Sequence, residues 1–144
     1  MMEKFDGKLL EGNDRIEEAI HLFHTAQTPE TWMAVCMAIR SRMDENGQLL
    51  FPADFMEDEQ GNTLIDFKTL EADGVPAAVA FTSLVEKRKG PPCGGVTHYF
   101  DSVMKPLLQI EHLGGLWINP WGESVYLGKE DIGLILTPGV ERFV

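Results

Sequence analysis

The first third of the chain places apolar residues at every third or fourth position, which is the period of an amphipathic helix. Residues 14–27 and 28–43 both follow this pattern. Asp14 with Glu17 three positions later resembles a capping box, and Thr28 before a proline is a helix start signal. The apolar faces consist of Ile16, Ile20 and Phe23 in the first stretch and Trp32, Val35, Cys36, Ile39 and Met43 in the second. Because almost no residues separate the two stretches, we expect a helical hairpin.

Beyond the turn-forming pair Asn46-Gly47, short apolar runs separated by turn residues replace the helical period. Pro52 inside the first run indicates an edge strand or a bulge. Residues 75–82 are small or β-branched and do not alternate, so we expect a strand buried on both faces. The runs that predict strands are 48–55, 63–67, 75–82, 116–118 and 124–127.

Helical patterns lie between and after these strands. Ser83 and Glu86 give the capping box of a short helix. Residues 99–113 predict a longer helix, which Pro106 must kink or whose start it must move. A final helix is predicted over 129–136, where a Thr-Pro-Gly sequence stops it.

This order of elements predicts an α+β or α/β sandwich. We favour an α+β fold, in which a mixed β-sheet packs with helices, with an N-terminal helical hairpin, in one domain over residues 1–144. The chain has 144 residues, of which 44% are hydrophobic, enough for a core that needs no metal or disulfide. The start of the sequence lacks the apolar run of a signal peptide, and no stretch approaches the length of a membrane span. We therefore expect a cytoplasmic protein without membrane binding.

The hairpin around residues 119–122 has the most unusual composition. Asn119, Pro120 and Gly122 occupy the favoured positions of a type I turn, and the Asn side chain is suited to bond the backbone two residues on. We expect Trp117 on the incoming strand and Trp32 on the second helix to be buried. Trp121 at the turn tip is expected to be partly exposed, as suits a contact surface for a partner.

Three segments together resemble the SseB N-terminal domain family: 75–92, 114–127 and 129–136. The matching positions are Ala80, Phe81, Thr82 and Ser83, then Gly90, Pro91 and Pro92, then Ile118, Asn119, Pro120 and Gly122. The resemblance covers residues 47–137. The sequence departs from the family at Pro106 and in ending after one domain, since some relatives have a second. The resemblance implies an α+β fold and a bacterial source, and it implies no established activity.

The formal net charge is −11, and it is concentrated in the first half of the chain. Residues 1–74 contain 16 acidic and 6 basic side chains, whereas residues 75–144 contain 7 and 6. Such a surface repels phosphate backbones, which disfavours nucleic-acid binding, and it attracts a basic protein. Solubility alone is the simpler explanation of the acidity.

The acidic side chains are densest between residues 54 and 73, where Lys68 is the only base. The acids there are Asp54, Glu57, Asp58, Glu59, Asp66, Glu71 and Asp73. On the edge of a sheet they would discourage aggregation between strands, which is the interpretation we favour. The functional alternative is that Glu57, Asp58 and Glu59 dock a basic protein, with Trp121 and Asn119 as the other candidate contact.

Two groups of residues suggest a metal site or a catalytic site. Glu17, His21 and His24 share one helix face and could present metal ligands, but a solvated polar face explains them, and we expect no metal and no cofactor. Cys93 follows a cluster of basic residues, which favours a thiolate, and His98 is the candidate base.

These observations leave three hypotheses. The first, which we favour, is a protein-interaction module that uses the acidic half or the Trp121 turn. The second is a hydrolase or transferase with Cys93 and His98 in hydrogen-bond reach within a cleft. The third is an acidic inhibitor or immunity-like protein that blocks a basic toxin or nuclease. The partner's identity and the oligomeric state stay open.

Overall fold

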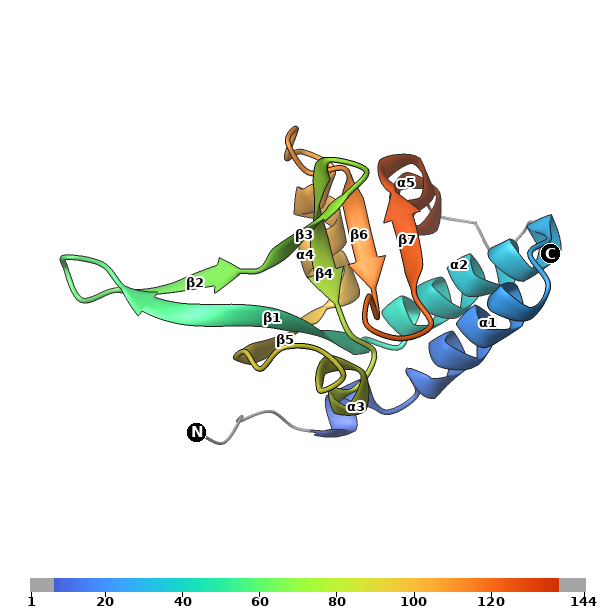
Figure 1. Ribbon diagram of the computed structural model, residues 1–144, viewed down its shortest axis with the longest axis horizontal. Coiled ribbons are helices and arrows are strands. Elements are labelled where there is room, and N and C mark those ends of the chain that lie inside the picture. The colour runs from blue at the N-terminus through green and yellow to red at the C-terminus, as the bar shows by residue number, and fades with distance from the viewer. Residues whose placement is uncertain (1–6, 138–144) are drawn as a thin grey trace.

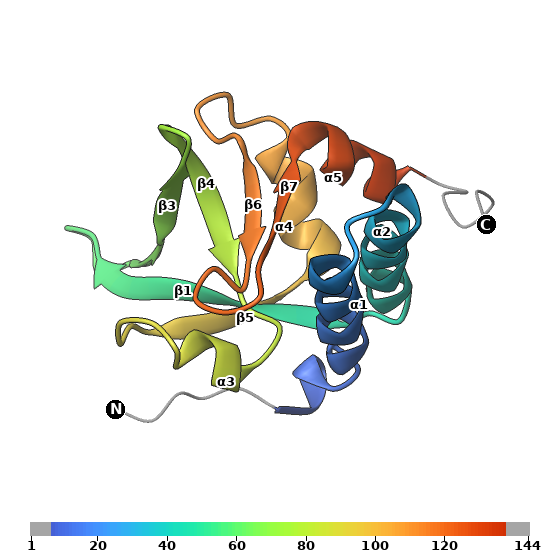
Figure 2. The same ribbon diagram turned by 45° about the vertical axis from the view of Figure 1, so that its right-hand side comes forward.

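A computed structural model describes residues 7–137, and its fold is α+β, as predicted (Figure 1). The helical elements are η1 (Gly7–Leu10), α1 (Asp14–Thr25), α2 (Pro29–Asp44), α3 (Leu84–Lys87), α4 (Phe100–Leu107) and α5 (Lys129–Leu136). The strands are β1 (Gln48–Glu57), β2 (Thr63–Phe67), β3 (Thr69–Ala72), β4 (Val75–Ala80), β5 (Gly95–Tyr99), β6 (Gly115–Ile118) and β7 (Val125–Gly128). The expected helical hairpin is confirmed as α1 and α2, which lie side by side in Figures 1 and 2.

The strands form two sheets. One has the order β2-β1-β5 and is antiparallel. The other has the order β3-β4-β6-β7 and is mixed, because β4 pairs with β6 in parallel while the remaining neighbours are antiparallel. Leu50 of β1 and Phe81 after β4 exchange two backbone hydrogen bonds of 3.0 and 2.7 Å, which join the sheets.

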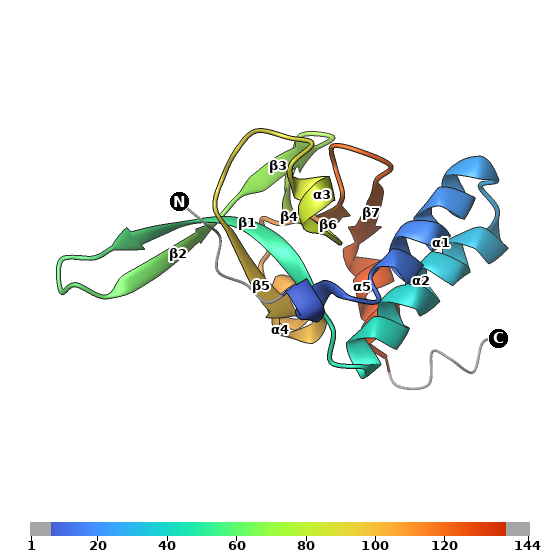
Figure 3. The same cartoon turned by 90° about the horizontal axis from the view of Figure 1, so that it is seen from below.

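The long strand β1 changes partners halfway along. Its first half, Gln48–Pro52, pairs with β5, and its second half, Ala53–Glu57, pairs with β2. The second half and β2 extend away from the rest of the molecule as a two-stranded ribbon (Figures 1 and 3). We call this ribbon, residues 53–67 with its connecting turn, the arm.

The prediction that Pro52 marks an edge strand is wrong, because β1 is the middle strand of its sheet. The missing N–H of Pro52 falls between two hydrogen-bonded positions on the same side of β1. Leu50, two residues earlier, is bonded to Phe81, and the Pro52 carbonyl itself accepts from the Lys68 N–H at 2.9 Å. The proline therefore leaves no ladder bond unmade where the strand passes from the body into the arm.

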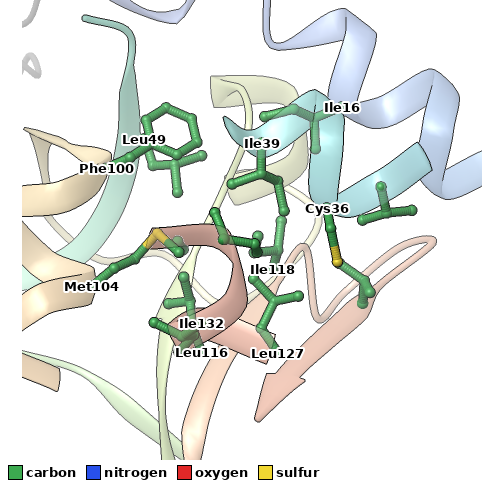
Figure 4. Close-up of a cluster of buried hydrophobic side chains, with 14 of the residues drawn as sticks. Ile16, Cys36, Ile39, Leu49, Phe100, Met104, Leu116, Ile118, Leu127 and Ile132 are labelled. Carbon is green, nitrogen blue, oxygen red and sulfur yellow. The ribbon is translucent and has the colours of Figure 1, made fainter. Parts of the chain in front are cut away.

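The helices α1, α2, α4 and α5 share one core with strands β1, β4, β6 and β7, as Figure 4 shows around Cys36, Ile118 and Met104. Burial raises the pKa of the Cys36 thiol to about 11, so this cysteine acts as an apolar core residue. The expectation that Trp32 and Trp117 are buried is wrong, since both are half-buried. Trp117 alternates with the core residues of β6 and so faces the other side of the sheet.

Several boundaries differ from the sequence prediction. Thr28 and Ser83 cap their helices as predicted, accepting hydrogen bonds from the N–H groups of Thr31 and Glu86. Asp14 does not cap α1, because the N-cap position is Asn13 and its side chain is used elsewhere. Strand β4 is not buried along its whole length as predicted, because Val75 is exposed and Pro76 and Ala78 are half-buried.

The helix α4 ends at Leu107, well short of residue 113, and Pro106 lies in its last turn, where its missing N–H favours termination. Strands β3 and β5 were not predicted at all. Strand β3 forms a hairpin with β4 whose turn residues Asp73 and Gly74 both have positive φ angles, 54° and 81°. Among the described residues no helix is both long enough and apolar enough to cross a bilayer.

Candidate functional site

The turn after β6 is closed as predicted, by a hydrogen bond of 3.2 Å from the Gly122 N–H to the Asn119 carbonyl. The Asn119 side chain does not bond the backbone of its own turn, however. The Asn119 Oδ1 accepts from the Thr82 N–H at 3.0 Å, and its Nδ2 donates to the Thr82 Oγ1 at 2.9 Å. Asn119 is only 2% exposed, so it cannot touch a partner and instead fixes the turn to the end of β4.

Helix α1 holds the same turn from the other side. The Thr82 hydroxyl donates to Glu17 Oε2 at 2.5 Å, His21 Nδ1 lies 2.9 Å from Glu123 Oε1, and His24 Nε2 donates to the Ser124 carbonyl at 2.6 Å. Glu17, His21 and His24, the candidate metal face, are thus engaged with protein groups. In the described part of the chain no group of three metal-ligating side chains lies together. We call these contacts of α1 and Thr82 with residues 119–124 the turn clamp.

A second buried polar cluster supports the clamp. The Asn13 Nδ2 donates to the carbonyls of Gln48 and Thr82 at 2.8 and 3.0 Å. Its Oδ1 accepts from Nε of the buried Arg42 at 2.8 Å. A Cβ at Gly47 would come within 2.4 Å of that guanidinium, so any larger residue there would force the Arg42 side chain to move. Sequence reasoning missed this cluster, and its one local signal is a polar Asn in front of an amphipathic helix.

Trp121 is 42% exposed, as expected for a turn tip, but its indole is seated against the chain. A Cβ at Gly90 would lie 2.1 Å from its Nε1, so the ring lies directly over the Gly90 backbone. With Pro91, Pro92 and Cys93 it lines a shallow hollow of about 300 Å³. Trp121 therefore holds down the loop before β5 as well as presenting one face to solvent.

The arm exposes apolar and acidic side chains side by side. Met56 and Leu64 are cross-strand partners and are 49% and 44% exposed. The next pair on the same face is Asp54 opposite Asp66, two like charges that would repel each other. Lys68 offsets this repulsion, with its Nζ 2.5 Å from Asp54 and 3.7 Å from Asp66, and the bond to Asp54 raises the pKa of Lys68.

The three acids at the arm tip have different roles. Asp58 forms the turn, because its Oδ1 accepts from the N–H groups of Asn62 and Gln60 at 2.8 and 3.0 Å. These bonds, that from the Asn62 N–H foremost, lower the pKa of Asp58. Glu57 and Glu59 are exposed, and neither has an ion-pair partner within residues 7–137. Only these two are free to meet a partner.

A cleft of about 500 Å³ lies between α4 and strands β1, β4 and β5. Its apolar walls include Phe51, Phe67, Val79, Val103, Leu107 and Leu113. His98 lines it and packs against the rings of Phe51 and Phe67, with centroid distances of 6.2 and 5.8 Å. His112 and Ser102 add polar groups at the same cleft.

Cys93 and His98 do not form the pair that the enzyme hypothesis requires. Cys93 lines the hollow under Trp121, whereas His98 lines the cleft. The strand from Gly95 to His98 alone spans about 10 Å, and no hydrogen bond in the described range joins the two side chains.

No family model, no curated protein and no solved structure matches this chain. The resemblance to the SseB N-terminal domain family therefore stays a prediction. The geometry of the turn clamp, the arm and the cleft is what supports a function.

Proposed function

We propose that this protein is an interaction module whose arm docks on a basic protein surface. The observation that carries the proposal is the pair Met56 and Leu64, half-exposed on the part of the arm beyond Ala53, where in the described structure each strand pairs only with the other. An isolated two-stranded ribbon is only marginally stable in water, and an exposed apolar pair on it marks a place where a partner can bury surface.

The charges beside this pair select the kind of partner. Glu57 and Glu59 lie at the tip, and Asp54 and Asp66 flank the apolar pair on the other side. A partner that presents apolar side chains bordered by Lys or Arg would match both features. A second copy of this chain fits poorly, because each copy has a net charge of −11 and the same acids on its arm.

Two broader proposals accompany this one. We propose a cytoplasmic location, which two free cysteines favour because reducing compartments keep thiols unpaired. We also propose membership of the SseB N-terminal domain family, supported by the Thr82-Ser83 step and the Asn-Pro-x-Gly turn. Should the partner be a basic toxin or nuclease, docking would make this protein its inhibitor, which is the third hypothesis from the sequence.

The test compares what the immobilised protein captures from a cell extract with what three variants capture. The arm variant is Met56→Ser with Leu64→Ser, and the acid variant is Glu57→Gln with Glu59→Gln, which keeps Asp58 and so the turn. The matched control is Leu22→Ser with Val85→Ser, two residues at least as exposed but outside the arm.

We expect a basic protein that binds the parent and the control, is lost with the arm variant, and binds the acid variant more weakly. Added salt should weaken its binding to the parent. Capture that is identical for parent and arm variant would contradict the proposal, as would binding indifferent to both salt and the acid variant.

A further inference from the structure

We propose that the cleft between α4 and strands β1, β4 and β5 is a binding site for an uncharged, mostly apolar small molecule that hydrogen-bonds to His98 and His112. This inference is independent of the docking function of the arm. It concerns a different class of ligand and a surface that shares only Phe67, at the base of the arm, with the arm.

The first support is the size and the floor of the cleft. Its volume of about 500 Å³ falls within the range of roughly 300–1,000 Å³ that is typical of small-molecule pockets. The floor is made of residues that are themselves buried, namely Phe51, Val79 and Leu107. Because these side chains belong to the packed interior, the concavity is part of the fold.

The second support is the contrast between two pairs of histidines. His21 and His24 both form hydrogen bonds in the turn clamp. His98 and His112 both line the cleft, and neither imidazole has a hydrogen bond or an ion pair with a protein group within the part of the chain that the structure describes. A neutral imidazole has one donor and one acceptor, so the two rings offer a ligand both kinds of bond.

The third support is the charge of the lining, which excludes ionised ligands. No carboxylate is among the described residues that line the cleft, so a cation would find no counter-charge. The one lysine there, Lys68, is already bound to Asp54 and Asp66. An anion would in addition meet the repulsion of a protein of net charge −11. The ligand that remains is an uncharged one with an apolar body and a hydroxyl, amide, amine or carbonyl group.

The probe for the test is N-phenyl-1-naphthylamine, an uncharged two-part aromatic amine whose fluorescence rises in apolar surroundings. We expect saturable binding of one molecule per protein. Val103→Phe fills the cleft and should weaken binding at least tenfold, whereas Val85→Phe, the same change on the exposed face of α3, should leave it unchanged. His98→Gln with His112→Gln should weaken binding several-fold while the fold is retained.

A second readout needs no variant. Nuclear magnetic resonance of the four imidazole rings should show that the probe shifts the signals of His98 and His112 and leaves those of His21 and His24 in place. The proposal is overturned if the parent shows no saturable binding, if Val103→Phe binds equally well, or if all four imidazoles move alike. It is also overturned if Met56→Ser with Leu64→Ser abolishes binding, since the probe would then be on the arm. That last result would leave the arm proposal standing, and so the two proposals fail separately.

Discussion

The β6–β7 turn and the tip of the arm are both short turns that join two strands, yet they relate to the rest of the molecule in opposite ways. The side chain of Asn119 bonds Thr82, 37 positions away, and histidines of α1 form hydrogen bonds with Glu123 and Ser124 of the same turn. The carboxylate of Asp58 bonds only Gln60 and Asn62 within its own turn. The β6–β7 turn is fixed by bonds to distant segments of the chain, and the arm turn is fixed by bonds within the turn.

Because of this difference, one turn contributes to the stability of the fold and the other is available to bind a partner. A turn whose polar groups are satisfied by buried long-range bonds cannot change partners without cost, because each broken bond would leave a group unsatisfied in the interior. A turn that closes on itself leaves its neighbours free to bind. The same division holds for the exposed apolar residues, since Trp121 is seated over Gly90 whereas Met56 and Leu64 are half-exposed partners across the arm.

The largest expected effect is that of Asn119→Ala. The change removes both bonds to Thr82, leaves the buried Thr82 N–H without its acceptor, and puts alanine at a φ angle of 54°. We expect a loss of about 2–3 kcal/mol in the free energy of unfolding, measured by urea denaturation. Asn62→Ala in the arm turn is the control and should cost about 0.5 kcal/mol or less. Equal losses for the two variants would remove the distinction between the turns.

A smaller effect is expected for Gly90→Ala. The added methyl group would overlap the indole of Trp121, so the ring must move and the protein should lose about 1–2 kcal/mol. In a background where Phe replaces Trp32 and Trp117, acrylamide should quench Trp121 more strongly in the Gly90→Ala variant. Gly133→Ala is the control, because nothing lies within 4 Å of its added Cβ and alanine favours the helix α5 by up to about 1 kcal/mol. Unchanged quenching of Trp121 would show that the ring is not seated as described.

Local signals in the sequence predicted the local structure well. The caps at Thr28 and Ser83, the 119–122 turn, the five α-helices and five of the seven strands were predicted, because each depends on residues close together in the sequence, whereas β3 and β5 were missed. The acidic residues at the tip of the arm could be identified from the sequence for the same reason. Asn119 was singled out correctly as unusual, but the predicted bond was wrong, since its partner is Thr82, which follows β4.

What the sequence could not give depends on distant segments meeting. Arg42 and Asn13 are 29 positions apart, and no pattern in either stretch predicts their bond. The arm begins where β5 stops pairing, at Pro52 and Gly95, and the one local sign of this in β1, Pro52, predicted an edge strand or a bulge and not a change of partner. The cleft is lined by segments from Phe51 to Leu113, so it has no motif.

The arm variant sharpens the comparison through a small effect on stability. Met56→Ser with Leu64→Ser should lower the free energy of unfolding by about 0.5 kcal/mol or less, because both side chains are half-exposed and belong to no buried cluster. Urea denaturation beside the Asn119→Ala variant measures this directly. A loss as large as that of Asn119→Ala would mean that the arm stabilises the fold, and its availability for a partner would be in doubt.

The smallest effect concerns the pH response of the arm tip. The pKa of Asp58 is lowered, chiefly by the bond from the Asn62 N–H, so its folded value lies below the unfolded value of about 3.9. The ordering that these bonds provide is therefore fully present above about pH 4 and fades as the pH falls through the folded pKa. The carboxyl carbon signal of Asp58, followed by nuclear magnetic resonance, should titrate at a lower pH in the folded protein than in concentrated urea. The amide signals of Gln60 and Asn62 should move with it, and this movement should vanish in Asp58→Asn, which keeps an acceptor but cannot ionise. Equal midpoints in folded and unfolded protein would show that the tip is not closed by Asp58.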